Sequence, residues 1–311
     1  MVECGFDTLM DSDAEIRSLA TQLQVSYANC VGLVADAVME RWEERGAEEE
    51  EGRRASVLTL VAAETGGEHN AAAATTSACH RDDTERPLAR DRHRAEAVRA
   101  LAFAAGAAGE ERCSHVSGDG KGMCVADGSE MGENEEDIAV LISKRSIRPV
   151  GLMFTSFKGR VAEAVGRDGG SANWALRTDE LSFEQVAAAG GFGGLDSNPR
   201  RVIVLSPDAP EALTGAPDRD ALYVIGGLCD YKRHKNATLD RAADANGHAA
   251  KASSNVAVEA RRLPIEEIFG GSVSVNILTV NQAVEALVRA DINGGDWAEA
   301  LEVTLPSRKL R

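Results

Sequence analysis

The chain has 311 residues, 43% of them hydrophobic, and a net charge of −16, which is enough for one large domain or two ordinary ones. It contains no run of 18 apolar residues, so no transmembrane helix is expected. Its acidic first residues lack the apolar core of a secretory signal. The six cysteines form no CxxC pair, which favours reduced thiols in the cytoplasm or nucleus over a disulfide framework.

The acidity lies mostly in the first half of the chain. Residues 1–148 hold 16 basic and 29 acidic side chains, whereas residues 149–311 hold 18 and 21. The second half is therefore nearly balanced, and a nucleic-acid partner is not excluded for it. Its local basic clusters could contact phosphates or could be ordinary solvated charges; they are Arg200-Arg201, Lys232 to Lys235, Arg261-Arg262 and Arg308-Lys309.

An N-terminal entry segment is predicted over residues 1–43, with a helix over 11–33. Ser12 and Glu15 stand three residues apart, which is the spacing of a capping box. Ile16, Leu19 and Leu23 then recur at helical spacing.

Residues 44–135 are predicted to be a low-complexity, disordered insertion. An acidic run, an alanine run and a glycine-rich stretch follow one another without sustained periodicity. The spacing of its cysteines and histidines matches no zinc pattern. No metal site is predicted there.

The pattern becomes α/β in the third region, residues 136–311. Continuous apolar runs predict buried strands at 150–157, 201–205, 221–228, 262–265 and 275–280. Helices are expected between and after them, at 158–166, 180–189, 208–214, 235–247, 281–290 and 296–303. This alternation predicts a parallel sheet with helices on both faces.

The most informative segment runs from Tyr223 to Lys235, where a buried strand enters a glycine pair, a carboxylate and a basic loop. Glycines at a strand end allow a ligand to approach the backbone closely, although Gly226 and Gly227 could also form an ordinary tight turn. In parallel sheets, ligands bind beyond the carboxyl ends of strands. Asp230 is therefore the candidate proton acceptor, with a helix N-cap or a salt bridge to Arg233 as the structural alternative.

Several motifs together resemble one family, the tRNA methyltransferases that modify N1 of the purine at position 9, within the SPOUT superfamily. The motifs are Phe154 to Arg160, Leu205 to Ala209, Tyr223 to Asp230, Arg262 to Ile265, Leu278 to Gln282, Gly295 to Trp297 and Pro306 to Lys309. In the first 30 residues, Phe6 to Met10 and Tyr27 to Asn29 also resemble the family's entry segment. The resemblance covers residues 1–30 and about 145–311.

The resemblance implies a SPOUT-type sheet with a C-terminal trefoil knot and S-adenosylmethionine as the cofactor. The cofactor-binding residues that it implies are Leu205, Ser206, Gly226, Gly227, Leu228, Cys229, Asp230, Lys235, Leu263, Leu278, Thr279 and Asn281. Simple core packing is an equal alternative for Leu263 and Leu278. Asn281 and Gln282 could bind the ligand or could cap the helix that begins there.

Asp230 is the catalytic residue that the resemblance implies. Guanine N1 carries a proton at neutral pH, and a carboxylate within reach can accept it during methyl transfer. Cys229 is expected to be a small buried side chain and not a nucleophile. Phe154 and Trp297 are expected in the core and not stacked on a base.

The RNA-binding residues that we expect are the basic loop of Lys232, Arg233, His234 and Lys235, and in addition Arg160. The expected function is methylation of tRNA at N1 of the purine at position 9, with guanine preferred, by a monomer that needs no membrane and no metal. An RNA-binding protein of the same fold, without activity or as a subunit of an RNA-processing complex, is the alternative. A nicotinamide dehydrogenase is disfavoured because no glycine-rich G-x-G-x-x-G turn follows any predicted strand.

Overall fold

The computed structural model describes residues 1–37, 40, 151–167, 174, 176–188, 201–229, 233–251, 256–270 and 277–306. Almost all of them belong to one compact unit, which includes Met1–Val34 and Pro149–Arg311. The predicted insertion at 44–135 lies outside the described residues. No helix in the described part of the chain is both long and apolar enough to cross a membrane.

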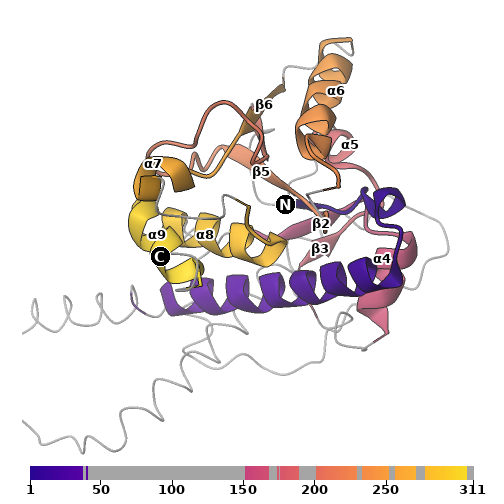
Figure 1. Cartoon of the computed structure of the whole chain (residues 1–311), viewed down its shortest axis with the longest axis horizontal. Coiled ribbons are helices and arrows are strands. Elements are labelled where there is room, and N and C mark those ends of the chain that lie inside the picture. Colours follow the sequence, from indigo (N-terminus) through magenta and orange to yellow (C-terminus); the bar gives the residue numbers. More distant parts are fainter. Residues whose placement is uncertain are drawn as a thin grey trace, which may run out of the picture. The chain divides into compact units, whose positions relative to one another are not determined.

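Six parallel strands form the sheet, in the order β3-β2-β1-β5-β4-β6. Figure 1 labels β2, β3, β5 and β6 among them. Their bounds are β1 Val2–Glu3, β2 Met153–Thr155, β3 Arg177–Thr178, β4 Arg201–Leu205, β5 Ala221–Gly226 and β6 Ala257–Arg261. The predicted parallel sheet is therefore confirmed. Strand β1, from the start of the chain, lies between β2 and β5 and joins the two halves of the sheet.

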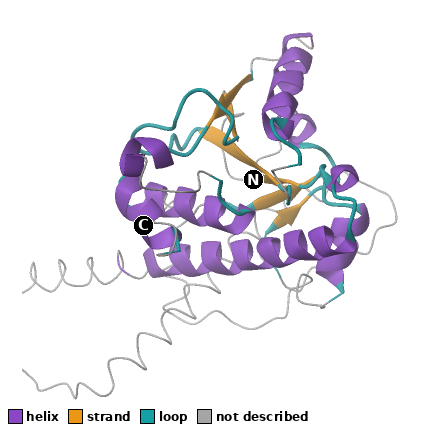
Figure 2. Cartoon of the chain, in the orientation of Figure 1, coloured by secondary structure: helices purple, strands orange, loops and turns teal. Residues whose placement is uncertain are grey.

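The helices that accompany the strands are α4 Gly159–Gly166, α5 Phe183–Ala188, α6 Ala237–Lys251, α7 Ile265–Phe269, α8 Val280–Ile292 and α9 Trp297–Thr304. A 3-10 turn, η1 Asp7–Leu9, precedes a helix over residues 13–37, called here the N-terminal helix. Figure 2 shows helices on either side of the strands. The predicted helices at 158–166, 180–189, 235–247, 281–290 and 296–303 are confirmed within a few residues at most of their ends.

Both faces of the sheet are buried. Neighbouring strand residues point to opposite sides, so each central strand contributes side chains to both faces. Val202, Val204 and Val224 form one core with side chains of α5 and α6. Ile203 and Ile225 face the other way and are also buried, on the side where α8 contacts β5. This two-sided burial explains why β4 and β5 read as continuous apolar runs in the sequence.

Three sequence predictions were wrong. Residues 208–214 are not helical: Pro210 cannot donate a backbone hydrogen bond, and Ala212 instead forms a bridge to Arg262. The sixth strand ends at Arg261 and not at 262–265, since this edge strand is only half-buried and lacks an apolar run. Helix α8 begins at Val280, where a strand was predicted, and residues 277–279 have no regular structure. The trefoil knot stays a prediction, because residues 230–232 and 271–276 lie outside the described part.

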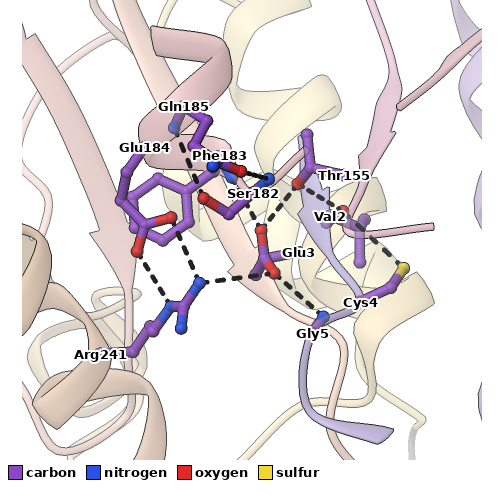
Figure 3. A network of polar contacts seen from close by, with 10 residues as sticks. All are labelled: Val2, Glu3, Cys4, Gly5, Thr155, Ser182, Phe183, Glu184, Gln185 and Arg241. Atoms are coloured by element: carbon purple, nitrogen blue, oxygen red, sulfur yellow. Dashed lines mark hydrogen bonds and ion pairs between the residues drawn. The ribbon is translucent and has the colours of Figure 1, made fainter. Parts of the chain in front are cut away.

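A buried carboxylate ties β1 to its surroundings (Figure 3). Glu3 is 1% exposed and its Oε2 accepts hydrogen bonds from Thr155 Oγ1 and from the Phe183 amide, both at 2.9 Å. Its Oε1 accepts from the Gly5 amide at 3.0 Å and lies 3.9 Å from the Arg241 guanidinium. Because charged groups are buried only when they are hydrogen-bonded or paired, this network fixes β1, β2, α5 and α6 relative to one another.

Candidate functional site

A cavity of about 320 Å³ opens beyond the carboxyl ends of β4 and β5. Leu205 pairs with Ile225 in β5 and with Arg261 in β6, so three strand ends lie level with one another at this edge. This is where ligands bind in parallel sheets. The lining residues come from the N-terminal helix, the ends of three strands, the starts of α6, α7 and α8, and the adjoining loops; they are Ser18, Gln22, Leu205, Ser206, Pro207, Ile225, Gly226, Leu228, Cys229, Thr238, Arg262, Leu263, Ile265, Glu266, Ile277, Leu278, Thr279, Val280 and Ala283.

Eight of the twelve predicted cofactor-binding residues line this cavity: Leu205, Ser206, Gly226, Leu228, Cys229, Leu263, Leu278 and Thr279. Gly227, Lys235 and Asn281 do not line it. Asp230 lies outside the described residues, directly after the lining residue Cys229. The structure thus gathers three separate loops of the sequence around one hollow.

Apolar side chains form much of the lining, and a small number of polar groups interrupt them. Leu263 and Leu278 also pack against the core that joins α7, α8 and α9, so their packing role and their position at the cavity coexist. Ser206 is buried, and its amide donates to the Arg261 carbonyl at 2.9 Å. An apolar hollow with convergent polar groups is typical of a small-molecule site.

Protein packing requires Gly227, the first residue after β5, and leaves little space beside Gly226, the last residue of β5. A Cβ at Gly227 would lie 2.8 Å from the Glu3 carbonyl oxygen, and a Cβ at Gly226 would lie 2.6 Å from Thr238 Oγ1. The Gly227 amide donates to that same carbonyl at 2.7 Å. The close approach that glycine permits here is therefore made by β1 and by α6, while Gly226 also lines the cavity.

The N-terminus of α8 supplies another wall. Thr279 and Gln282 form a capping box, in which the Thr279 amide donates to Gln282 Oε1 at 3.2 Å. Thr279 Oγ1 also bonds to Asn281 Oδ1 at 2.8 Å. Of the two roles open for Gln282, the structure therefore shows the capping role.

Gln22 closes the cavity from the N-terminal helix. Its Oε1 accepts from the Val280 amide at 2.8 Å, and its Nε2 donates to Ser18 Oγ and to Cys229 Sγ. Sequence reasoning missed Ser18 and Gln22. Their only signal is a four-residue spacing beside the apolar stripe of the helix, and many solvent-facing polar pairs share it.

Two charged residues line the cavity, and they differ in their partners. The Arg262 guanidinium bonds Glu267 through two nitrogens, at 2.6 and 2.7 Å. This bond holds the pKa of Glu267 below and that of Arg262 above their usual values. Glu266 is exposed, and no ion pair joins it to another described residue. Among the described lining residues, Glu266 therefore adds a negative charge beside the Arg262–Glu267 pair.

The predicted RNA-binding arginines bond acidic residues around the start of the N-terminal helix. Arg160 bonds Asp13 at 3.0 Å and the Met10 carbonyl at 2.8 Å. Arg233 bonds Glu15 at 3.1 Å and also pairs with Asp11. Both arginine side chains remain more than two-fifths exposed. Tertiary contacts that join distant segments decide these pairings, and the sequence gives no sign of them.

The other members of the basic loop differ from Arg233. Lys235 is exposed, and His234 is half-buried, with its Nε2 bonded to no other described residue. Lys232 lies outside the described residues. Phe154 and Trp297 are buried in the core as expected, and Trp297 Nε1 donates to the Gly215 carbonyl at 2.8 Å. Cys229 is half-buried, more open than expected.

Comparison with known proteins adds a family to this geometry. Residues 139–310, more than half of the chain, match the family model of the tRNA (guanine(9)-N(1))-methyltransferase TRM10/TRM10A. A tRNA (guanine(9)-N1)-methyltransferase of Cryptococcus neoformans is 32% identical over 115 residues, 37% of this chain and 26% of that protein. The enzyme of that name in Schizosaccharomyces pombe is 28% identical over 171 residues, 54% of this chain and 49% of that protein.

Solved structures give a weaker likeness. The crystal structure of full-length spTrm10 in complex with SAH is 26% identical, with a TM-score of 0.39, and the match covers 51% of this chain and 76% of that chain. A Trm10 structure from Thermococcus kodakaraensis is 14% identical, with a TM-score of 0.33, over 66% of this chain and 89% of that chain. The chain spans between a quarter and half of the length of the two curated relatives.

Proposed function

Because the chain belongs to the tRNA (guanine(9)-N(1))-methyltransferase TRM10/TRM10A family, we propose that it methylates N1 of the purine at position 9 of tRNA, with guanine preferred. The observation that carries the proposal is the cavity, since the strand-end loops that match the family surround it together. A hollow beyond the carboxyl ends of parallel strands suits a nucleoside-containing ligand.

The residues present fit S-adenosylmethionine. A volume of about 320 Å³ lies within the range of about 300–1,000 Å³ that small-molecule sites occupy. Leu205, Leu263 and Leu278 offer apolar surface for a base, and Ser206 and Thr279 offer polar groups beside it. When bound there, S-adenosylmethionine supplies an electrophilic methyl group. No described residue is required to act as a nucleophile toward it.

Asp230 is the proposed general base. It follows Cys229, which lines the cavity, so its position in the chain suits a proton acceptor beside the ligand. Removal of the N1 proton of guanine by a carboxylate contributes about 10²- to 10⁴-fold in rate. Adenine N1 has a free lone pair and needs no base. A carboxylate at this position has a proton to accept only when the substrate is guanine, which supports the preference for guanine.

For the tRNA contact we propose Arg160 together with the basic loop over residues 232–235, whose members Lys232, Arg233, His234 and Lys235 differ in how far they are available to phosphates. Such contacts place the nucleic acid without reading its sequence. The acidic partners of Arg160 and Arg233 lower the positive charge available to phosphates, so Lys235 is the strongest described candidate. The proposed state is a monomer in the cytoplasm or nucleus.

Methyl transfer from labelled S-adenosylmethionine to two tRNA transcripts, with G or A at position 9, tests this function. N1-methylguanosine on the G transcript alone is expected. Asp230→Asn should bind the cofactor normally and lose guanine methylation. Cofactor binding without product on either transcript would favour the alternative, an RNA-binding protein of this fold without activity.

A further inference from the structure

Arg233 belongs to the segment that follows β5, residues 227–236, called here the segment after β5. It connects this segment to the start of the N-terminal helix. Its guanidinium bonds Glu15 Oε1 at 3.1 Å and pairs with Asp11, although more than 200 residues separate these partners in the sequence. We propose that Arg233 is a positioning residue for methyl transfer, which holds the segment after β5 in place through these two carboxylates. The effect on catalysis rests on the proposed function, whereas the structural effect does not.

The Glu15 carboxylate is held in its orientation by a capping box with Ser12, independently of Arg233. Its Oε2 accepts a hydrogen bond from the Ser12 amide at 3.0 Å, and Ser12 Oγ accepts one from the Glu15 amide at 3.2 Å. The backbone bond to Ser12 and the nearby Arg233 together hold the pKa of Glu15 below its usual value. Exposed ion pairs are weak partly because two long side chains must be ordered. Here the capping box has already ordered one of them.

The segment is anchored on both sides of residues 230–232. Before them, Cys229 Sγ accepts from Gln22 Nε2 at 3.3 Å. After them come the pairs of Arg233, and then the Asn236 amide donates to Asp208 Oδ2 at 2.9 Å. Asn236 has a φ of 63°, a conformation tolerated by asparagine and otherwise uncommon. The proposed base Asp230 therefore belongs to a stretch of three residues whose two neighbours both contact the N-terminal helix.

The surrounding charge favours positioning over phosphate binding for Arg233. Two carboxylates face one guanidinium, and both of its terminal nitrogens are engaged. A phosphate at this place would meet net negative charge and would have to displace a carboxylate. Lys235 is only two residues away and is exposed, and no ion pair joins it to another described residue. The two cations thus provide a matched comparison within one loop.

Four single variants of the full chain test the proposal, Arg233→Ala, Glu15→Gln, Lys235→Ala and Arg219→Ala, together with the double variant that combines Arg233→Ala and Glu15→Gln. Glutamine keeps the capping box at position 15 and removes the charge that faces Arg233. Arg219 bonds Asp291 through two nitrogens in a pair of the same kind that lies outside the cavity lining. It controls for the general loss of a surface pair.

The first readout is hydrogen–deuterium exchange of peptides that cover residues 226–238, which requires neither cofactor nor activity. Exchange should accelerate by about threefold or more in Arg233→Ala and in Glu15→Gln, because local opening becomes easier. It should not change in Arg219→Ala. Unchanged exchange in both of the first two variants would overturn the proposal, even if the chain proves to have no methyltransferase activity.

The second readout separates positioning from RNA contact. Single-turnover methylation at saturating tRNA should fall about tenfold in Arg233→Ala and in Glu15→Gln, with no further loss in the double variant. The tRNA dissociation constant should rise in Lys235→Ala alone. A raised dissociation constant with an unchanged rate in Arg233→Ala would instead make Arg233 a phosphate contact. Absence of product in the unaltered protein would refute the proposed function, and exchange would still decide the structural claim.

Discussion

Gln22 Nε2 donates a hydrogen bond to Cys229 Sγ at 3.3 Å, across 207 residues of sequence. The same side chain accepts from the Val280 amide at 2.8 Å. One glutamine therefore connects the N-terminal helix, the segment after β5 and the start of α8. These three elements form three sides of the cavity, so the shape of the cavity depends on a helix from the far end of the chain.

The thiol of Cys229 should report whether the cavity is occupied. Cys229 is half-buried and lines the cavity, whereas Cys4 and Cys30 are buried. Burial raises the pKa of the Cys4 thiol far above its usual value and that of Cys30 to about 11, so both remain protonated and unreactive. Of these three described thiols, alkylation followed by peptide mass spectrometry should modify Cys229 first. Saturating S-adenosylhomocysteine should protect Cys229, and equal labelling with and without it would place the ligand elsewhere.

Filling the cavity should weaken cofactor binding without unfolding the protein. Ala283 lies on α8 and lines the cavity, and Ala283→Leu adds three carbon atoms there. A loss of cofactor affinity of about tenfold or more is expected by calorimetry, since the added atoms occupy ligand space. Ala298→Leu, on the exposed face of α9, is the control and should bind normally. Normal affinity in both variants would contradict the assignment of the cavity.

The glycine after Gly226 should tolerate no side chain. In Gly227→Ala the new Cβ would meet the Glu3 carbonyl oxygen at 2.8 Å, and the backbone of β1 can yield little. A loss of about 1–3 kcal/mol in the free energy of unfolding is expected, measured by urea titration. Gly247→Ala meets no atom within 4 Å. It should be neutral or stabilising by up to about 1 kcal/mol, because alanine favours helix α6.

Removal of the buried carboxylate should cost more than removal of an exposed one. Glu3→Ala leaves the amides of Gly5 and Phe183 without their acceptor and leaves Thr155 Oγ1 only the longer bond to the Val2 carbonyl, at 3.4 Å (Figure 3). The expected loss is about 2–4 kcal/mol in the free energy of unfolding, from unsatisfied buried donors. Glu302→Ala, which is exposed on α9, should change it little. Equal stabilities of the two variants would show that the network contributes nothing.

Acid should weaken the fold through the carboxylates that bond arginine. The hydrogen bond from Arg201 lowers the pKa of Glu259 in the folded protein from its usual 4.5. At pH values between the folded and the unfolded pKa, the unfolded chain therefore binds more protons than the folded one. The contribution of Glu259 is therefore complete above about pH 4.5 and is lost as the pH falls through the folded pKa. Urea titrations from pH 7 to pH 3 should show a smaller decline in Glu259→Gln. An identical decline would exclude Glu259 as a source of acid sensitivity.

The sequence alone determined the elements that a strong local signal marks. Strands β4 and β5 are apolar on both faces, so their runs are continuous. The capping box of Ser12 and Glu15 requires only a three-residue spacing, and the structure contains both of its hydrogen bonds. The strand-end motifs likewise indicated where the cavity would lie.

Only the tertiary structure decided what depends on distant partners. Strand β1 has two residues, too few for a periodic signal, and it is placed by pairing with β2 and β5. Gln22 reaches the cavity because its helix packs beside α8, and Arg233 pairs with Asp11 and Glu15 because the N-terminal helix begins beside the segment after β5. Composition and residue spacing do not predict such contacts, because two residues can come together in the folded protein at many different separations in the sequence.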